Sequence, residues 1–199
     1  VATAVAETLS RSERNFALEM TAKARSMGMK RTTFRNASGL PHRGQLSTAK
    51  DMATLALRLI KDFPEYYHFF STKNFFYKGK NHTNHNKLLK TYSGTDGIKT
   101  GYIRASGFNL VVSVERKNKR LIGVVFGGRT SRMRNIHMTK LLDKSYAKLE
   151  PINDHFDKNN KVSLSRSNQI IKKLLWGVQV GAYKTSAPAF KIAKLALEK

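Results

Sequence analysis

The run Asp96-Gly-Ile-Lys-Thr-Gly-Tyr102 holds the residue types with the clearest chemical potential in this sequence. The ammonium group of Lys99 and the hydroxyl group of Thr100 could together bind a carboxylate. Gly101 has no side chain, so an extended peptide could pair with the strand backbone there. The amide of Tyr102 could donate a hydrogen bond to a developing oxyanion. Taken alone, a turn followed by a strand explains the same residues.

Three strand-like runs would have to position this segment. They cover residues 95–103, 108–115 and 120–126. The second and third runs are joined by Arg116-Lys-Asn-Lys119, which suits a four-residue hairpin loop. The segment with chemical potential is therefore expected on the first of three consecutive strands.

Helices are expected on both sides of these strands in the sequence. Residues 1–29 have helical periodicity, and a capping box at Ser10-Arg-Ser-Glu13 divides them into two helices. Ser47 is expected to cap a third helix that ends before Pro64. A final helix is expected over residues 130–149. Together these elements predict one α+β body over residues 1–150.

The composition limits the function classes. The chain has 199 residues, 40% of them hydrophobic, which excludes wholesale disorder. There are 37 Lys and Arg against 13 Asp and Glu, a formal net charge of +24, so we expect an anionic partner. The absence of cysteine excludes disulfides, thiol catalysis and cysteine-ligated metals. No apolar run reaches the roughly 18 residues that span a bilayer.

The character of the sequence changes after residue 150. Residues 151–172 are mostly polar and predict a linker. Alternating apolar residues then predict a strand over residues 176–183, and a helix follows over residues 187–197. We therefore expect residues 173–199 to begin a second, small α/β domain.

Residues 93–128 closely resemble the D-alanyl-D-alanine carboxypeptidases among the low-molecular-mass penicillin-binding proteins. The run that begins at Asp96 carries the resemblance, and its Lys-Thr-Gly is a motif of penicillin-binding proteins and β-lactamases. Three further segments, beginning at Met20, Thr33 and Ser47, agree with the family in the same order. The resemblance covers about residues 1–145.

This resemblance implies a penicillin-binding or β-lactamase-like fold, an antiparallel sheet flanked by helices. It implies a serine-type carboxypeptidase whose serine attacks the terminal D-Ala-D-Ala amide of a peptidoglycan stem peptide. Lys99 and Thr100 would bind the terminal carboxylate, Gly101 would give backbone access, and the Tyr102 amide would complete the oxyanion hole. It implies no metal or organic cofactor, β-lactams as substrate mimics, and a place in the periplasm or cell envelope.

The nucleophile of that family is not found in its expected place. The family needs a Ser-x-x-Lys and then a Ser-x-Asn, both before the helix that begins here at Val1. We therefore expect a fragment that lacks its nucleophile, with any membrane association through segments that the fragment also lacks. Ser47-Thr-Ala-Lys50 and Ser145-Tyr-Ala-Lys148 match the letters of the first motif. The order of the family favours a helix cap for Ser47, and Ser145 falls within a predicted helix.

Two smaller features have simple explanations. His82 and His85 lie in a predicted polar loop over residues 78–90, and no carboxylate cluster accompanies them, so we predict no metal site. Arg129 could attract the substrate carboxylate, although a solvated arginine is the simpler interpretation.

An aromatic run over residues 69–77 is compatible with a strand. Its residues Phe75, Phe76 and Tyr77 could form a platform for a ligand. Because aromatic side chains in strands are usually buried, we expect them in the core.

Two other functions stay open. The run Trp176-Gly-Val-Gln-Val-Gly-Ala-Tyr183 resembles the opening of a SPOR domain, a family that binds peptidoglycan. The chain could then be a non-catalytic peptidoglycan-binding adaptor. A nucleic-acid binder would rest on the net charge alone. Since 28 basic residues lie in residues 1–150 and 9 in residues 151–199, no segment concentrates them, and we expect no nucleic-acid partner.

Overall fold

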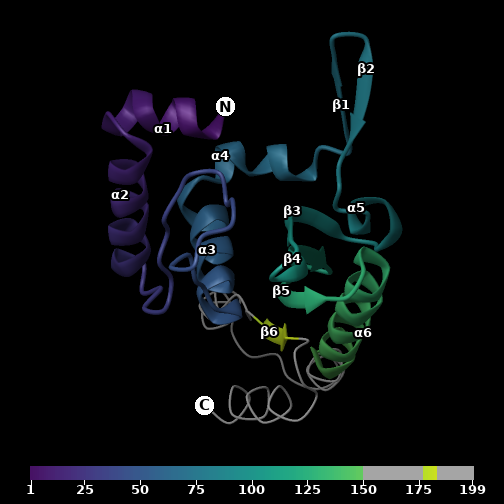
Figure 1. Cartoon of the computed structure of the whole chain (residues 1–199). Helices are drawn as coiled ribbons and strands as arrows, with labels where there is room; N and C mark the ends of the chain where they lie inside the picture. The colour runs from purple at the N-terminus through teal and green to yellow at the C-terminus, as the bar shows by residue number, and fades with distance from the viewer. Residues whose placement is uncertain (150–176, 183–199) are drawn as a thin grey trace, which may run out of the picture.

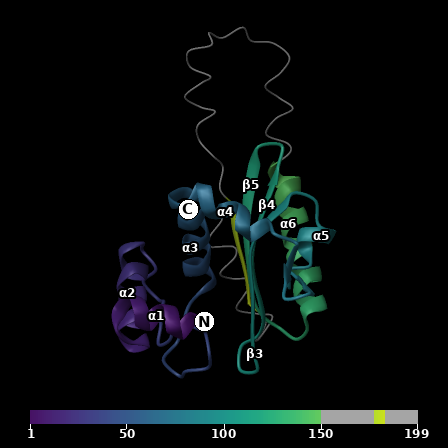
Figure 2. The same cartoon turned by 90° about the horizontal axis from the view of Figure 1, so that it is seen from above.

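The core of the fold is a sheet with helices on both faces. A computed structural model describes residues 1–149 and 177–182 of the chain. The described sheet contains, in spatial order, β3 (Thr95–Ile103), β4 (Gly107–Arg116), β5 (Lys119–Gly128) and β6 (Gly177–Ala182). β3, β4 and β5 are antiparallel neighbours, whereas β6 pairs with β5 in parallel. Figures 1 and 2 show α3 on one side of this sheet and α6 on the other. The predicted α+β class and the antiparallel strands are confirmed.

Small side chains on α3 (Ala49–Asp62) let this helix lie close to the sheet. Ala49, Ala53 and Ala56 recur at a spacing of three to four residues and form a buried stripe. This stripe packs with Ile122 and Val124 of β5. The sequence predicted the helix correctly but not its cap, because the hydroxyl group of Thr48 accepts the hydrogen bond.

The start of α3 corrects the interpretation of Ser47. The Thr48 side chain accepts from the amide of Asp51 at 3.1 Å and caps the helix. The hydroxyl group of Ser47 lies 2.9 Å from that of Thr32, outside the helix. Lys50, the second residue of α3, is exposed.

The opposite face of the sheet packs against α6 (Ser131–Leu149). The buried residues of this helix recur at every fourth position and are Arg134, Met138, Leu142 and Tyr146. Five strand residues meet the last three of them in one core cluster: Leu110, Val112, Val114, Leu121 and Val125. In β4 these residues alternate along the strand, as expected for side chains on one face.

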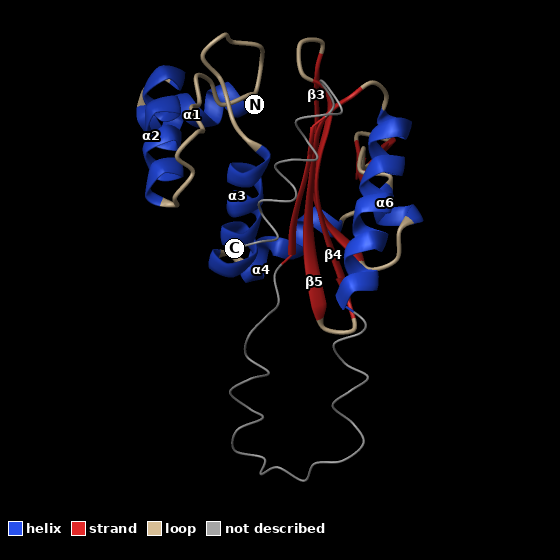
Figure 3. Cartoon of the chain, turned by 90° about the horizontal axis from the view of Figure 1, so that it is seen from below, coloured by secondary structure: helices blue, strands red, loops and turns tan. Residues whose placement is uncertain are grey.

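Two N-terminal helices lie beyond α3 from the sheet, as Figure 3 shows. They are α1 (Ala2–Ser10) and α2 (Glu13–Ser26), so the predicted break between them is confirmed. The cap of α2 is Ser12, whose hydroxyl group accepts from the amide of Asn15 at 3.1 Å. The hydroxyl group of Ser10 instead donates to Glu19 at 2.8 Å.

The segment between α3 and β3 differs most from the prediction. It contains α4 (Pro64–Tyr67), the 3-10 helix η1 (His68–Ser71), β1 (Asn74–Tyr77), β2 (Lys80–Thr83) and α5 (Leu88–Thr91). β1 and β2 form an antiparallel hairpin, so the prediction of a loop over residues 78–90 is wrong. The aromatic residues of β1 are exposed rather than in the core. The reason is that this hairpin stands out from the body, and no helix or strand of the described residues covers it (Figure 1).

β6 lies within the strand predicted over residues 176–183. It continues the sheet of the main body through its pairing with β5. The linker predicted over residues 151–172 and the helix predicted over residues 187–197 lie outside the described residues. None of the described helices is long and apolar enough to cross a membrane.

Candidate functional site

The candidate site lies along the edge strand of the described sheet. β3 stands at one end of the strand order, so no described strand pairs with its outer edge. Gly101 and Tyr102 are exposed on this strand. A side chain at Gly101 would approach no atom closer than the Cβ of Asn109, at 3.9 Å. Packing within the fold therefore does not require a glycine here, whereas pairing with an extended ligand would favour one.

A cavity of about 580 Å³ opens beside this strand. Four segments line it: Lys99, Thr100, Gly101 and Tyr102 of β3; Thr83, Asn84, His85 and Lys87 at and after the end of the hairpin; Phe108 of β4; and Ser131 and Arg134 of α6. The wall thus combines hydrogen-bond donors, cations and the open backbone of a strand. This combination suits an extended ligand that ends in an anion.

Arg134 contributes a buried cation to the cavity wall. The residue is 2% exposed, and its Nη1 donates to the carbonyl of Asn109 at 3.0 Å. Its Nε and Nη2 donate to the side-chain oxygen of Asn135 at 3.0 and 2.8 Å. Within residues 1–149 it forms no ion pair with a carboxylate. Burial lowers the pKa of Arg134, yet a guanidinium group stays protonated at neutral pH. An incoming carboxylate would therefore relieve an uncompensated charge.

Two glycines at the end of β5 allow Arg134 to reach this position. Gly127 has a φ of +75°, which favours glycine, and its amide donates to the side chain of Asn109 at 3.0 Å. A side chain at Gly128 would come within 2.8 Å of the Cβ of Arg134. The close approach of β5 to the start of α6 thus fixes Arg134 beside the strands.

Thr100 and Arg134 lie on the same face of the sheet. Thr100 pairs with Leu110, whose side chain belongs to the core cluster that also contains residues of α6. Paired residues project to the same face, and successive residues alternate, so Lys99 projects toward the other face. The ammonium group of Lys99 donates to the carbonyl of Thr100 at 2.8 Å. A carboxylate could therefore meet a hydroxyl group and a guanidinium group from two different elements.

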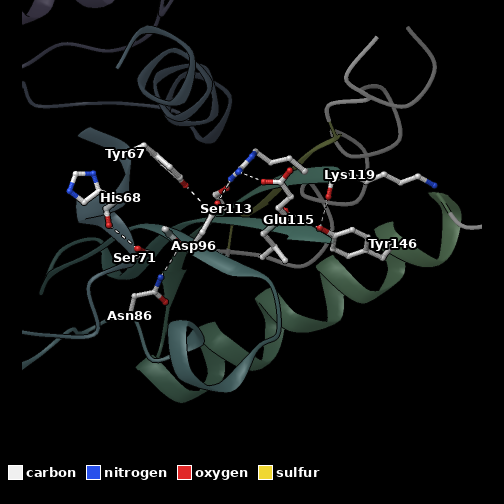
Figure 4. A network of polar contacts seen from close by, with 12 residues as sticks. Tyr67, His68, Ser71, Asn86, Asp96, Ser113, Glu115, Lys119 and Tyr146 are labelled. Atoms are coloured by element: carbon white, nitrogen blue, oxygen red, sulfur yellow. Dashed lines mark hydrogen bonds and ion pairs between the residues drawn. The ribbon is translucent and has the colours of Figure 1, made fainter. Parts of the chain in front are cut away.

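A polar network holds the start of β3 (Figure 4). The phenol of Tyr67 donates to Asp96 at 3.0 Å, and Asp96 also forms an ion pair with Arg120 of β5. Arg120 donates to Ser113 at 2.6 Å. Burial raises the pKa of Tyr67. Burial alone would lower the pKa of Arg120, but its hydrogen bond and charge interaction with Asp96 raise it. The phenol of Tyr67 therefore stays neutral, and the guanidinium group of Arg120 stays charged, at neutral pH.

Asn86 joins the cavity wall to β3 in the same region. Its side-chain Nδ2 donates to the carbonyl of Gly97 at 3.0 Å, and its Oδ1 accepts from the amide of Leu88 at 3.2 Å. Asn86 is 2% exposed. A side chain at Gly97 would come within 2.6 Å of the phenol oxygen of Tyr67, so this position needs a glycine for close approach. The backbone just before Lys99 is thus fixed from both sides.

The structure separates the candidates from the sequence into two groups. Lys99, Thr100, Gly101 and Tyr102 line the cavity together, and His85 joins them. The remaining candidates are absent from the wall: Ser47, Ser145, His82 and Arg129. Arg129 is exposed, in agreement with the solvated interpretation. Among the described residues, no group of three His, Asp or Glu side chains could hold a metal ion.

Arg134 is the site residue that the sequence analysis missed. An arginine in an amphipathic helix is normally assigned to the solvent face. The available signal was its spacing, since it precedes Met138, Leu142 and Tyr146 by multiples of four residues. Ile136, two residues further along the helix, is 46% exposed, so the buried face of α6 begins at Arg134.

Comparison with known proteins gives a single family. The family described as D-alanyl-D-alanine carboxypeptidase matches residues 1–130. The chain is 37% identical over 156 residues to the D-alanyl-D-alanine carboxypeptidase DacF of Bacillus subtilis, covering 74% of this chain and 39% of DacF. It is 37% identical over 150 residues to DacC of Escherichia coli, covering 75% of this chain and 38% of DacC.

Solved structures agree with this result. Penicillin-binding protein 5 of Haemophilus influenzae superposes with a TM-score of 0.66 at 33% identity, over 73% of this chain and 43% of that protein. Penicillin-binding protein D2 of Listeria monocytogenes, solved with cefotaxime bound, gives a TM-score of 0.65 at 30% identity, over 73% of this chain and 60% of that protein. The chain spans about two fifths of the length of the curated relatives named above. By sequence and by fold, it belongs to the D-alanyl-D-alanine carboxypeptidase family.

Proposed function

We propose that this chain forms the substrate-carboxylate side of a serine-type D-Ala-D-Ala carboxypeptidase that acts on peptidoglycan stem peptides. The observation that carries the proposal is that Thr100 and Arg134 line one cavity, at the edge of β3 that no described strand pairs with. The guanidinium group of Arg134 is buried without a carboxylate partner in residues 1–149, and a D-Ala carboxylate would supply one.

Each residue of the motif has a distinct role in this proposal. The hydroxyl group of Thr100 binds the terminal carboxylate, and Lys99 adds positive charge at the strand edge. Gly101 leaves the backbone open, so that the peptide can pair with β3 as an added strand. The amide of Tyr102 donates to the oxyanion that forms at the scissile carbonyl.

The nucleophile of the reaction is expected outside this chain. The relatives are longer than the match, and neither Ser47 nor Ser145 lines the cavity. We propose that the attacking serine and its activating lysine belong to the part of the relatives that this chain does not span. The Listeria protein was solved with ampicillin as well as cefotaxime, which supports β-lactams as substrate mimics for the whole enzyme. A place in the periplasm or cell envelope follows from such a substrate.

Binding of a minimal substrate tests this proposal on the chain itself. We expect N-acetyl-D-Ala-D-Ala to shift the amide resonances of Thr100 and Tyr102 in an NMR titration. The C-terminal amide of the same dipeptide should bind at least tenfold more weakly, because it lacks the carboxylate. Arg134→Met should weaken binding of the free acid about tenfold or more, whereas the matched control Arg129→Met should change it less than twofold. Equal binding of acid and amide would contradict the assignment.

Labelling with a fluorescent penicillin, followed by intact mass, tests the place of the nucleophile. We expect no covalent adduct on this chain, and an adduct on a longer chain that includes the family's Ser-x-x-Lys. An adduct at Ser47 would make that serine the nucleophile and would overturn the proposed order of motifs.

The adaptor is the second candidate function. It depends on a SPOR-like domain that begins within residues 173–199, for which the resemblance of residues 176–183 is the support. The continuation of the main sheet by β6 does not separate this segment from the main body. A chain truncated at residue 150 distinguishes the two functions. Loss of peptidoglycan binding with retained dipeptide binding would favour the adaptor.

A further inference from the structure

The β1–β2 hairpin exposes three large aromatic side chains that the proposed reaction does not use. Phe75, Phe76 and Tyr77 are 60%, 71% and 54% exposed. Folded proteins seldom expose consecutive aromatic residues unless the surface binds something. Figure 1 shows the hairpin standing out from the rest of the chain. These exposed aromatic residues therefore indicate a ligand-binding surface rather than packing in a core.

The two faces of the hairpin differ. Phe75 and Tyr77 project to one face, and their rings are stacked at 6.1 Å with an interplanar angle of 14°. Their cross-strand partners on the same face are His82 and Lys80. We call Phe75, Tyr77, Lys80 and His82 the platform face. Phe76 projects to the opposite face, where its partner is Asn81.

The turn of the hairpin adds a further cation to the platform face. Lys78 and Gly79 both have positive φ, 48° and 74°, as in a two-residue turn of type I′. This turn brings the ammonium group of Lys78 to 5.5 Å from the ring centre of Tyr77. The platform face thus presents two parallel aromatic rings flanked by ammonium groups.

The charge around the hairpin has one sign. Residues 66–95 contain no Asp or Glu and five lysines. The lysines are Lys73, Lys78, Lys80, Lys87 and Lys90. An anionic ligand is therefore favoured over a neutral or cationic one.

The base of the hairpin is part of the wall of the candidate site. Thr83, the last residue of β2, lines the cavity together with Asn84 and His85. Asn84 closes the base, because its amide donates to the carbonyl of Lys73 and its Nδ2 to the carbonyl of Thr72, both at 2.9 Å. A polymer whose side branch enters the cavity would therefore run past the hairpin.

We propose that the platform face binds sugar rings of the anionic glycan polymer that carries the peptide bound in the cavity. The inference rests on the proposed function, because it is that substrate which joins a peptide to a glycan. The apolar faces of pyranose rings stack on aromatic rings, and the two parallel rings offer such a surface. The lysines attract the acidic groups of the polymer. A wedge that enters a lipid bilayer would use Phe76 as much as the platform face.

Sedimentation of the full chain with purified peptidoglycan tests this inference. Phe75→Ser/Tyr77→Ser leaves the net charge unchanged, so the general electrostatic attraction of a basic chain stays constant. We expect this double variant to bind about tenfold more weakly. The control Phe76→Ser removes a more exposed aromatic ring from the opposite face, and it should bind within twofold of the unaltered chain. Circular dichroism should show that both variants keep their fold.

Three outcomes would overturn the inference. Equal losses of peptidoglycan binding in Phe76→Ser and in the double variant would show that the platform face has no special role. Hairpin-dependent binding to vesicles of anionic lipid would favour a membrane wedge. Displacement of the chain from peptidoglycan by a single-stranded oligonucleotide, through the same face, would favour nucleic acid. Binding of N-acetyl-D-Ala-D-Ala is the separate readout. It should be unchanged in the double variant, and its absence in every variant would count against the proposed function alone.

Discussion

The side chain of Asn86 donates a hydrogen bond to the carbonyl of Gly97 at 3.0 Å, two residues before Lys99 (Figure 4). The same side chain accepts from the amide of Leu88 at 3.2 Å. One buried amide thus satisfies the backbone of β3 and the first turn of α5 together. Because Thr83 and Asn84 line the cavity just before it, Asn86 links β3 to the segment that forms another wall of the candidate site.

We expect Asn86→Ala to destabilise the chain by about 1–3 kcal/mol, because it leaves a buried carbonyl and a buried amide without partners. Denaturant unfolding followed by circular dichroism measures this loss. The variant should also weaken binding of N-acetyl-D-Ala-D-Ala at temperatures where it is fully folded. Asn81→Ala, at an exposed position of β2, is the matched control and should change stability by less than about 0.5 kcal/mol. A stable Asn86→Ala variant would show that the two walls are held by other contacts.

We expect the free energy of unfolding to fall at alkaline pH because of Tyr146. Its phenol donates to the carbonyls of Val114 and Lys119 at 2.8 and 3.1 Å, and burial raises its pKa to about 12. In the unfolded chain a tyrosine titrates near pH 10. Between these values the unfolded chain loses a proton that the folded chain keeps, so stability falls as the pH rises.

Tyr146→Phe should therefore change the pH dependence as well as the stability. We expect a loss of about 1–2 kcal/mol from pH 6 to 9, where both hydrogen bonds are present in the unaltered chain. The free energies of unfolding of the two proteins should converge as the pH rises from about 10 to 12. A constant difference across this range would show that Tyr146 does not titrate with unfolding.

Two single variants distinguish the capping role of Thr48 in α3 from the role of its neighbour Ser47. Thr48→Ala removes the hydroxyl group that accepts from Asp51, and should cost about 1 kcal/mol of stability. Ser47→Ala removes a contact with the hydroxyl group of Thr32 at 2.9 Å and a long hydrogen bond to the carbonyl of Thr48 at 3.4 Å, and should cost less. The same pair tests the Ser-x-x-Lys match, since neither variant should alter binding of N-acetyl-D-Ala-D-Ala. A selective loss of ligand binding in Ser47→Ala would mean that Ser47 belongs to the binding site.

The sequence predicted well where one local rule decided the structure. The strands from Thr95 to Gly128 and the helix before Pro64 follow from periodicity and helix-breaking residues, and the structure confirms them. The sequence failed where burial depended on distant elements. Phe76 lies in an aromatic run that is typical of a buried strand, but no element of the described residues packs against the hairpin. Arg134 is a charged residue of a type usually found on the solvent face of a helix, but the close approach of Gly128 buries it. Neither environment can be inferred from neighbouring residues in the sequence.

Gly101 gives the sharpest test of how a ligand would lie on β3. A Cβ atom at this position would meet only the Cβ of Asn109, at 3.9 Å, and the position is exposed, so we expect Gly101→Val to fold normally. Stability should be unchanged or rise by up to about 1 kcal/mol, because valine favours a strand and loses less chain entropy than glycine. If a peptide pairs with the edge of β3, the added side chain should weaken binding of N-acetyl-D-Ala-D-Ala by about tenfold.

The control for this variant is Asn81→Val, which adds the same branched side chain to an exposed strand outside the cavity. It should leave dipeptide binding within twofold. Amide chemical shifts of Thr100 and Tyr102 report the ligand directly, and denaturant unfolding reports stability in the same samples. Full dipeptide binding by a folded Gly101→Val would mean that the ligand reaches Thr100 and Arg134 without pairing to β3. The carboxylate contact would then stand, because the dipeptide acid and amide still differ, while the added-strand arrangement would fail.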